Sequence, residues 1–267
     1  FIYEDRLYIS FTTNNNNCNE INVSFAKINL DFLKFQNLFS SKSCNKTGAP
    51  GRIQFFEKDN TKGILLSTSE GIHDKPGSNT QNQNSIFGKI LFIPFNRELP
   101  KEIYSMGHRV IQGLNVNDNV IISTEHGPRG GDEINRILFN KNYGWPIASL
   151  GERYDFKYDK KKLDYKKDHL KLNFEEPIFS FIPSIGISEI IKLPSKFSIY
   201  YNNHYLLSSL NGKSLYLIRF NSDFKKIISF ERVFINNRIR DIKYSELNKS
   251  IILALEENGE IGIISNN

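Results

Sequence analysis

Short runs of apolar residues recur along the whole chain, and residues that favour turns separate them. Each run spans about four to eight residues, is rich in Ile, Leu, Phe and Tyr, and is bounded by Asn, Gly, Asp, Ser or Pro. Helical periodicity is weak, and LDFLKFQNLFS at 30–40 fits a helix or a strand with a loop equally well. The pattern therefore predicts an all-β fold of antiparallel strands. The runs include LYISF, NVSFAKINL, GRIQFF, GILLSTS, GKILFI, NVIISTE, FSIYYNNHYLLSSL, SLYLIRF, IILALEE and EIGIIS.

Four of these strands share a common form, in which an apolar strand ends in a small polar turn. The four are KGILLSTSEG, DNVIISTEHG, HYLLSSLNG and KSIILALEENG. Another short strand follows each of them. Repeats of about four short strands are typical of the blades of a β-propeller. The length of 267 residues predicts one propeller domain over 1–267 with about five blades, and the turns after equivalent strands should gather on one face.

The net charge of +6 raises the question of nucleic-acid binding. The lysines are scattered, however, and the one dense run, KYDKKKLDYKKDHLK at 157–171, is interspersed with acids, as in a solvated insertion. No nucleic-acid-binding motif occurs, and no G-x-G-x-x-G leads from a strand into a helix, which argues against a NAD enzyme. No apolar run is long enough to span a membrane, and no signal peptide opens the chain.

The chain has two cysteines, Cys18 and Cys44, and their spacing is not that of a CxxC motif. A zinc or thiol redox site is therefore not expected. They form either one disulfide in an oxidising compartment or two free thiols, and the sequence leaves both open.

Residues 124–136, TEHGPRGGDEINR, concentrate an acid, a histidine, a proline and several glycines in one loop. Glycine and proline predict a turn, and acids with unpaired carbonyls can bind a hard cation. The alternative is a long acidic turn at the surface.

Three motifs, in this order, resemble the soluble quinoprotein glucose dehydrogenase and aldose sugar dehydrogenase family. They are GHRVIQGL at 107–114, TEHGPRGGDEIN at 124–135 and NKNYGWP at 140–146. Family members are six-bladed propellers that use pyrroloquinoline quinone (PQQ) and calcium. The resemblance covers nearly the whole chain and begins within the second blade, so the first blade is expected to be missing. A dimer contact at the edges left exposed is a dependent expectation.

The resemblance implies an oxidoreductase that acts on the CH–OH group of aldose sugars and passes electrons to an acceptor. It also implies a periplasmic or secreted location. Because PQQ is a flat tricarboxylate, its site needs fixed cations, and arginine pairs well with carboxylates. The resemblance assigns this role to Arg109, which it also places in the catalytic set, and to Arg238 and Arg240. Residues two apart on a strand share a face, so this last pair can reach one ligand.

By the same resemblance, the backbone carbonyls of Gly127 and Pro128 bind calcium, and Asp132 lies near the cofactor. His126 would lie beside the metal or pack under the loop. Gly144, Trp145 and Pro146, in the NYGWP motif, are expected to brace the site rather than touch the ligands. All these groups are expected to face one axial pocket.

The sequence departs from the family at the general base. The family histidine lies four residues before the arginine of the strand that begins GRIQF, and here that position is Gly48. Glu70 matches the acid that orients this histidine, and His73 is a candidate substitute base. Val110 stands where the family has Asn. Two functions remain: a PQQ-dependent sugar dehydrogenase impaired at its base, or a non-catalytic propeller that binds a ligand or a partner protein.

Overall fold

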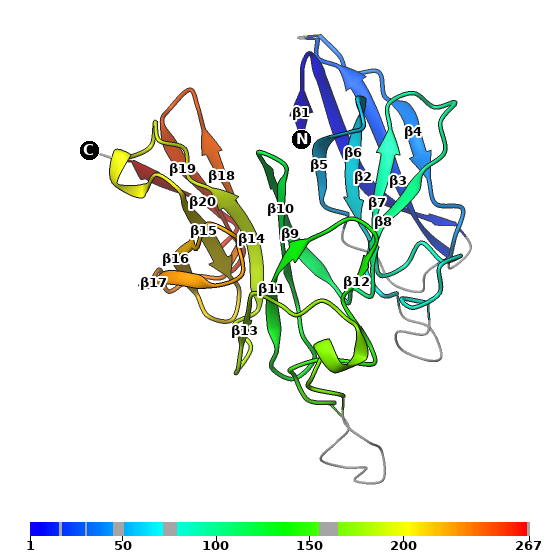
Figure 1. Ribbon diagram of the computed structural model, residues 1–267. Helices are drawn as coiled ribbons and strands as arrows, with labels where there is room; N and C mark the ends of the chain where they lie inside the picture. Colours follow the sequence, from blue (N-terminus) through cyan, green and yellow to red (C-terminus); the bar gives the residue numbers. More distant parts are fainter. Residues whose placement is uncertain (16–17, 30, 45–50, 72–78, 155–164, 266–267) are drawn as a thin grey trace. The chain divides into compact units, whose positions relative to one another are not determined.

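Five β-sheets make up most of the described chain, and their strands pair antiparallel except for the short β12 (Lys141–Asn142), which pairs with β8 (Glu102–Met106) in parallel (Figure 1). Helix within the described chain is limited to two short 3₁₀ turns, η1 (Leu170–Leu172) and η2 (Ile199–Tyr201), and no helix there is long and apolar enough to cross a membrane. The computed structural model describes residues 1–15, 18–29, 31–44, 51–71, 79–154 and 165–265.

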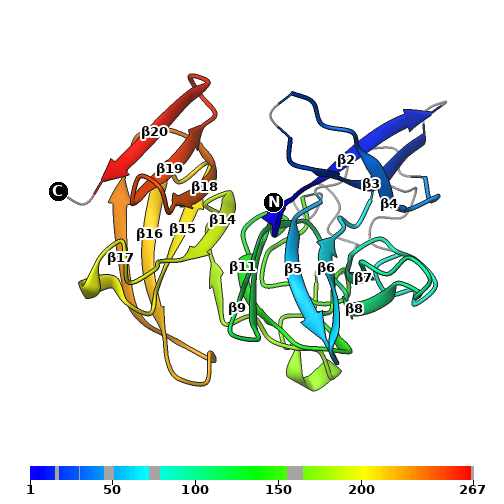
Figure 2. The ribbon, with the colours of Figure 1, turned by 90° about the horizontal axis from the view of Figure 1, so that it is seen from above.

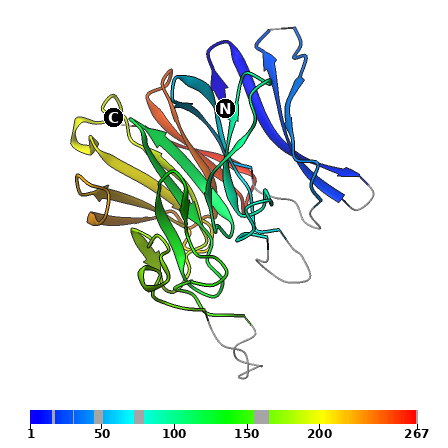
Figure 3. The same ribbon diagram turned by 45° about the vertical axis from the view of Figure 1, so that its right-hand side comes forward.

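The contacts divide the chain into two compact units. The first unit comprises residues 1–111, 138–148 and 169–175 and contains two sheets. The long hairpin of β2 and β3 is drawn in blue in Figure 3. The first sheet, in spatial order, is β1 (Ile2–Tyr3), β2 (Arg6–Asn15), β3 (Cys18–Lys27) and β4 (Gln36–Ser40), and the second is β12 (Lys141–Asn142), β8 (Glu102–Met106), β7 (Lys89–Pro94), β6 (Thr61–Ser67) and β5 (Ile53–Lys58).

The second unit comprises residues 112–137, 149–168 and 176–267 and contains three sheets. In one of them, β14 to β17 lie side by side in chain order (Figure 2). The strands, again in spatial order, are β13 (Phe179–Phe181), β11 (Asp132–Ile137), β10 (Val120–Glu125) and β9 (Ile111–Asn117); β14 (Ile187–Lys192), β15 (His204–Ser209), β16 (Ser214–Phe220) and β17 (Ile227–Phe234); and β18 (Ile239–Ser245), β19 (Ser250–Leu255) and β20 (Glu260–Ser265).

Two of the hairpins turn on an Asp-Asn pair with positive φ at both residues. Asp59 and Asn60 have φ of 50° and 62°, and Asp118 and Asn119 have φ of 47° and 63°. Asp and Asn tolerate this left-handed conformation better than most side chains, and a two-residue turn of this kind matches the twist of a β-hairpin. The Asp59-Asn60 turn therefore sets the register between β5 and β6. The Asp118-Asn119 turn closes the hairpin of β9 and β10 in the same way.

In the middle sheet of the second unit, the strands β14 to β16 are mostly buried, whereas β17 is exposed along most of its length. In β15, Tyr205 and Leu207 pack into one hydrophobic cluster and Leu206 packs into the other. Successive side chains of a strand point to opposite faces, so a sheet covered on both sides needs an unbroken apolar run. The apolar run YLL at 205–207, in the centre of β15, meets this need. Ile122 and Ile134 of the preceding sheet complete the first of the two clusters.

The strand pattern confirms the predicted all-β propeller with about five blades, and the five sheets are its blades. The four repeated segments become β6, β10, β15 and β19, each the second strand of its sheet in chain order. Of the segment 30–40, the described residues 31–40 take the strand-and-loop form, because β4 begins at Gln36. The expected strand at 197–210 is shorter, since η2 precedes β15. One continuous domain over 1–267 stays a prediction.

The two cysteines are joined. Cys18 opens β3, Cys44 follows β4, and their sulfurs form a disulfide. Of the two states that the sequence allows, the structure therefore has the oxidised one, and the bond ties the start of β3 to the chain beyond β4 in the first sheet.

Candidate functional site

In the first unit, Glu70 and Arg109 lie against each other, and Trp145 joins them. Arg109 Nε is 3.5 Å from Glu70 Oε1, and Trp145 Nε1 donates to Glu70 Oε2 at 2.6 Å. The guanidinium carbon of Arg109 lies 5.2 Å from the centre of the indole ring, within the range of a cation–π contact. The backbone N–H of Glu70 donates to the Arg109 carbonyl at 2.7 Å. Both oxygens of this carboxylate are therefore engaged, and its orientation is fixed.

Trp145 is held by Thr80, Gln81 and Gly107, of which only Gly107 lies in one of the three motifs. Its carbonyl accepts from Thr80 Oγ1 at 2.6 Å and from Gln81 Nε2 at 2.7 Å, and its N–H donates to the Gly107 carbonyl at 2.9 Å. The indole is 5 % exposed. Trp145 therefore links Glu70 and Arg109 to the segment that carries Thr80 and Gln81. Its bracing of a cofactor site stays a prediction.

Lys89 fixes the segment that supports Trp145. The lysine is fully buried, and its Nζ donates to the carbonyls of Asn79 at 3.0 Å, Thr80 at 2.8 Å and Phe87 at 2.8 Å. Three acceptors match the three donors of an ammonium group. Burial lowers the pKa of Lys89 to about 8, so the charged form still predominates at neutral pH. A lone lysine inside the apolar run GKILFI is the sequence signal that points to this role.

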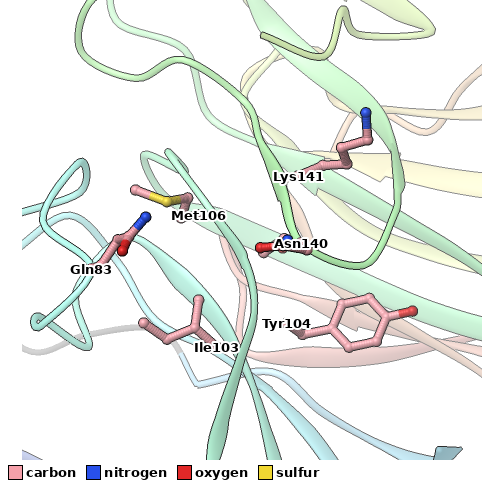
Figure 4. A pocket seen from close by; sticks show the side chains of 7 residues that line it. Gln83, Ile103, Tyr104, Met106, Asn140 and Lys141 are labelled. Carbon is pink, nitrogen blue, oxygen red and sulfur yellow. The ribbon is translucent and has the colours of Figure 1, made fainter. Parts of the chain in front are cut away.

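A shallow pocket also lies in the first unit, beside the NYGWP motif (Figure 4). Figure 4 shows Ile103 and Tyr104, neighbours on β8, projecting to opposite sides of the strand. Lys141 is already paired with Glu175, at 2.8 Å. The polar side chains of this pocket do not converge on one point, so we do not place the functional site there.

In the second unit, the carboxylate of Asp132 organises the loop 126–131. Its Oδ1 accepts from Gly127 N at 3.1 Å and Ser184 Oγ at 2.9 Å, and its Oδ2 accepts from Ile185 N and Ile187 N at 3.0 Å each. The side chain is 1 % exposed. The structure therefore gives Asp132 the role of fixing the loop, and a contact with a cofactor stays a prediction.

The same loop carries Gly127 and Pro128, whose backbone carbonyls are predicted to bind calcium. Arg129 and Glu152 exchange two backbone hydrogen bonds, of 3.1 and 2.9 Å, and Tyr154 Oη donates to the Pro128 carbonyl at 3.2 Å. A Cβ on Gly127 would meet the Gly131 carbonyl oxygen at 2.2 Å, so only glycine fits there. No three His, Cys, Asp or Glu side chains of the described ranges are arranged to hold a metal. The donors that fit calcium here are carbonyl oxygens.

Two buried glutamates pair across the strands that lead into and out of this loop. Glu125 on β10 is the register partner of Glu133 on β11, and they are 4 % and 9 % exposed. Burial, and then the charges of Glu125 and Asp132, raise the pKa of Glu133 to about 8, although a hydrogen bond from Asn135 opposes the rise. Glu133 therefore carries a proton near neutral pH.

The raised pKa of Glu133 predicts a pH-dependent stability. Between about pH 4.5 and pH 8 the folded state binds a proton that the unfolded state has released, so the free energy of unfolding falls as pH rises. We expect Glu133→Gln to flatten this slope and to be more stable than the parent at pH 8 by roughly 1–3 kcal/mol. Thermal unfolding from pH 5 to pH 8 measures the slope. Glu231→Gln, at an exposed position of β17, is the matched control, and an unchanged slope in Glu133→Gln contradicts the assignment.

The other two predicted arginines meet one carboxylate in the last sheet. Arg238 Nε and Nη2 lie 3.3 and 3.2 Å from Glu256 Oε1, and Arg240 Nε lies 2.5 Å from Oε2. Lys213, which directly follows the segment HYLLSSLNG, pairs with Glu257, the residue after Glu256, at 2.9 Å. The pair Arg238 and Arg240 is thus brought together within the second unit, as their spacing predicts. No motif in the sequence marks either glutamate as part of a site.

The structure leaves part of the predicted site untested. Gly48 and His73 lie outside the described residues, as does much of the lysine-rich segment 157–171. Glu70, Arg109 and Trp145 belong to the first unit, whereas Gly127, Pro128, Asp132, Arg238 and Arg240 belong to the second. Their convergence on one axial pocket stays a prediction.

Comparison with known proteins decides the family. The family model for glucose/sorbosone dehydrogenase matches residues 1–263. The chain belongs to this family. Aldose sugar dehydrogenase YliI of Escherichia coli is 27 % identical over 260 residues, which are 90 % of this chain and 67 % of that protein. Quinoprotein glucose dehydrogenase B of Acinetobacter calcoaceticus is 35 % identical over 79 residues, which cover 26 % of this chain and 16 % of that protein.

Solved structures of the family share the fold. The apo-form of the E. coli soluble aldose sugar dehydrogenase matches with a TM-score of 0.80 and 21 % identity, over 98 % of this chain and 79 % of that one. The PQQ-bound aldose sugar dehydrogenase of Streptomyces coelicolor matches with a TM-score of 0.70 and 20 % identity, over 97 % and 74 % of the two chains. The resemblance drawn from the three motifs is confirmed.

Proposed function

We propose that this member of the glucose/sorbosone dehydrogenase family binds PQQ with calcium and acts on the CH–OH group of aldose sugars. The observation that carries the proposal is the family match over residues 1–263. Relatives include an aldose sugar dehydrogenase and a quinoprotein glucose dehydrogenase, and one solved relative contains PQQ. The cations that a tricarboxylate needs are present in the described residues, at Arg109, Arg238 and Arg240.

The residues of this chain would act mainly by binding and orienting. Arg238 and Arg240 would hold carboxylates of the cofactor, and the carbonyls of Gly127 and Pro128 would hold calcium. Glu70 and Trp145 keep the Arg109 guanidinium in place. When bound, PQQ supplies a hydride acceptor and calcium supplies a Lewis acid.

The proton of the sugar hydroxyl needs a separate acceptor. Glycine at position 48 has no side chain to accept it, which favours a slow enzyme or the second candidate function, a non-catalytic propeller that binds a ligand or partner.

The disulfide between Cys18 and Cys44 supports a periplasmic or secreted location, because such bonds persist in oxidising compartments. The electron acceptor and a dimer remain proposals.

Titration of the apoprotein with PQQ, with and without calcium, tests the proposal. We expect calcium-dependent binding that Arg238→Ala/Arg240→Ala weakens by about 10- to 100-fold, because each charged hydrogen bond contributes about 1.5–3 kcal/mol. Arg97→Ala, at an exposed arginine that contacts the Asn37 carbonyl, is the control. Absence of PQQ binding at saturating calcium would contradict the proposal for PQQ and leave the ligand-binding propeller.

A further inference from the structure

One carboxylate lies between the two arginines of the last sheet and contacts each through a different oxygen. Glu256 Oε1 accepts from Arg238, and Oε2 accepts from Arg240. The backbone supports the arrangement, since Glu256 N donates to the Arg238 carbonyl at 2.8 Å. Arg238 immediately precedes β18 and Glu256 immediately follows β19, and the register pair Ile239 and Leu255 lies next to them. The contact is therefore built on paired strands.

Both guanidinium groups contact Glu256 through the same edge, which is formed by Nε and Nη2. Arg238 and Arg240 each present Nε and Nη2 to the carboxylate. A guanidinium has five N–H donors in a rigid plane, and its Nη1/Nη2 end can bind a second carboxylate. Neither Nη1 atom has a partner among the described residues, and the two side chains are 36 % and 44 % exposed. The ends that remain available can thus meet an anionic ligand.

Holding two arginines in advance matters for affinity. A free arginine side chain has many rotamers, and immobilising it at the moment of binding costs about 0.5–1.5 kcal/mol.

Glu256 is itself 35 % exposed, so its contact is open to solvent. Burial acts to raise the pKa of Glu256, but the hydrogen bonds from Arg240 and Arg238 lower it overall, so the carboxylate stays ionised at neutral pH.

We propose that Glu256 is a positioning residue, which holds Arg238 and Arg240 by their Nε edges and presents their Nη ends to a polycarboxylate. The inference rests on the proposed function and deepens it, because it names the residue that prearranges the anion site. An alternative role of Glu256 predicts the opposite effect on ligand affinity. A carboxylate that merely occupied the arginines would repel and compete with the ligand, so its removal would strengthen binding.

Three variants separate geometry from charge. Glu256→Gln removes the charge, whereas Glu256→Asp keeps the charge but is one methylene too short to reach both arginines. Glu260→Gln removes the same charge from an exposed position at the start of β20 and is the control. The probes are PQQ and benzene-1,3,5-tricarboxylate, titrated into the apoprotein. The Nε–H resonances of Arg238 and Arg240 are followed by ¹⁵N NMR in the absence of ligand.

We expect both Glu256 variants to bind the tricarboxylates about tenfold more weakly than the parent, because two side chains must then be ordered on binding. Their arginine Nε–H signals should move to the values of mobile side chains, whereas Glu260→Gln matches the parent in both measurements. Unchanged thermal unfolding in Glu256→Gln separates positioning from a loss of fold.

The outcomes distinguish the inference from the proposed function. Tighter binding by Glu256→Gln, or parent-like binding by Glu256→Asp, overturns the positioning role. If the parent binds benzenetricarboxylate but not PQQ, and the Glu256 variants bind it more weakly, the positioning role stands and the cofactor assignment fails. If the parent binds neither probe, both fail.

Discussion

Replacing Gly48 with histidine is expected to raise the rate of sugar oxidation by about a hundred- to ten-thousand-fold, which is the contribution of a positioned general base. The resemblance places the family base at this position, four residues before Arg52. The acid assigned to orient it, Glu70, is present, and Trp145 and Arg109 fix its carboxylate. Dye reduction by glucose, with saturating PQQ and calcium, measures the gain.

In the unmodified chain, we expect cofactor binding to be retained and sugar turnover to be slow. The unmodified chain should bind PQQ in the presence of calcium and yet reduce dye only slowly. Glu70→Gln, introduced beside Gly48→His, should remove most of the gain if the acid orients the new base. Brisk sugar oxidation by the unmodified chain contradicts this account, and His73→Ala then decides whether that histidine is the base.

The strands could be predicted because their causes are local. An apolar run that ends in a small polar turn specifies β6, β10, β15 and β19 without reference to the rest of the chain. Segment 197–203 shows the limit of that logic. It contains the apolar residues of a strand, but Ile199 and Tyr200 are 76 % and 83 % exposed in a 3₁₀ turn, where Ser198 Oγ accepts from Tyr200 N.

The residues that organise the candidate site were harder to predict, because their partners are distant or are backbone groups. Lys89 is held by three carbonyls, and no residue type marks a carbonyl acceptor. Asp132 bonds to residues more than 50 positions away. Glu256 lies 18 residues from Arg238, and only strand pairing brings them together. Motif resemblance assigned the arginines to the cofactor, which stays a prediction, and it carried no information about what holds them.

Removing the carboxylate of Asp132 is expected to give the largest loss of stability among these variants. Asp132→Ala leaves the N–H groups of Gly127, Ile185 and Ile187 and the hydroxyl of Ser184 without their acceptor in a buried site. Breaking a buried charged network from one side costs about 3–5 kcal/mol. Urea unfolding followed by far-UV circular dichroism measures the loss. Tryptophan fluorescence is unsuitable, because the single tryptophan, Trp145, belongs to the other unit.

Hydrogen exchange locates the effect and tests its cause. The amides of Gly127, Ile185 and Ile187 should lose protection first in Asp132→Ala, because they donate to the deleted oxygens. Asp132→Asn keeps one oxygen and should be intermediate, while Asp31→Ala, at an exposed loop residue, should match the parent. Since this carboxylate also fixes the loop with the Gly127 carbonyl, calcium-dependent PQQ binding should weaken in proportion. Uniform loss of protection across the second unit, with these amides no faster than the rest, would show that Asp132 supports the fold in general and not this loop.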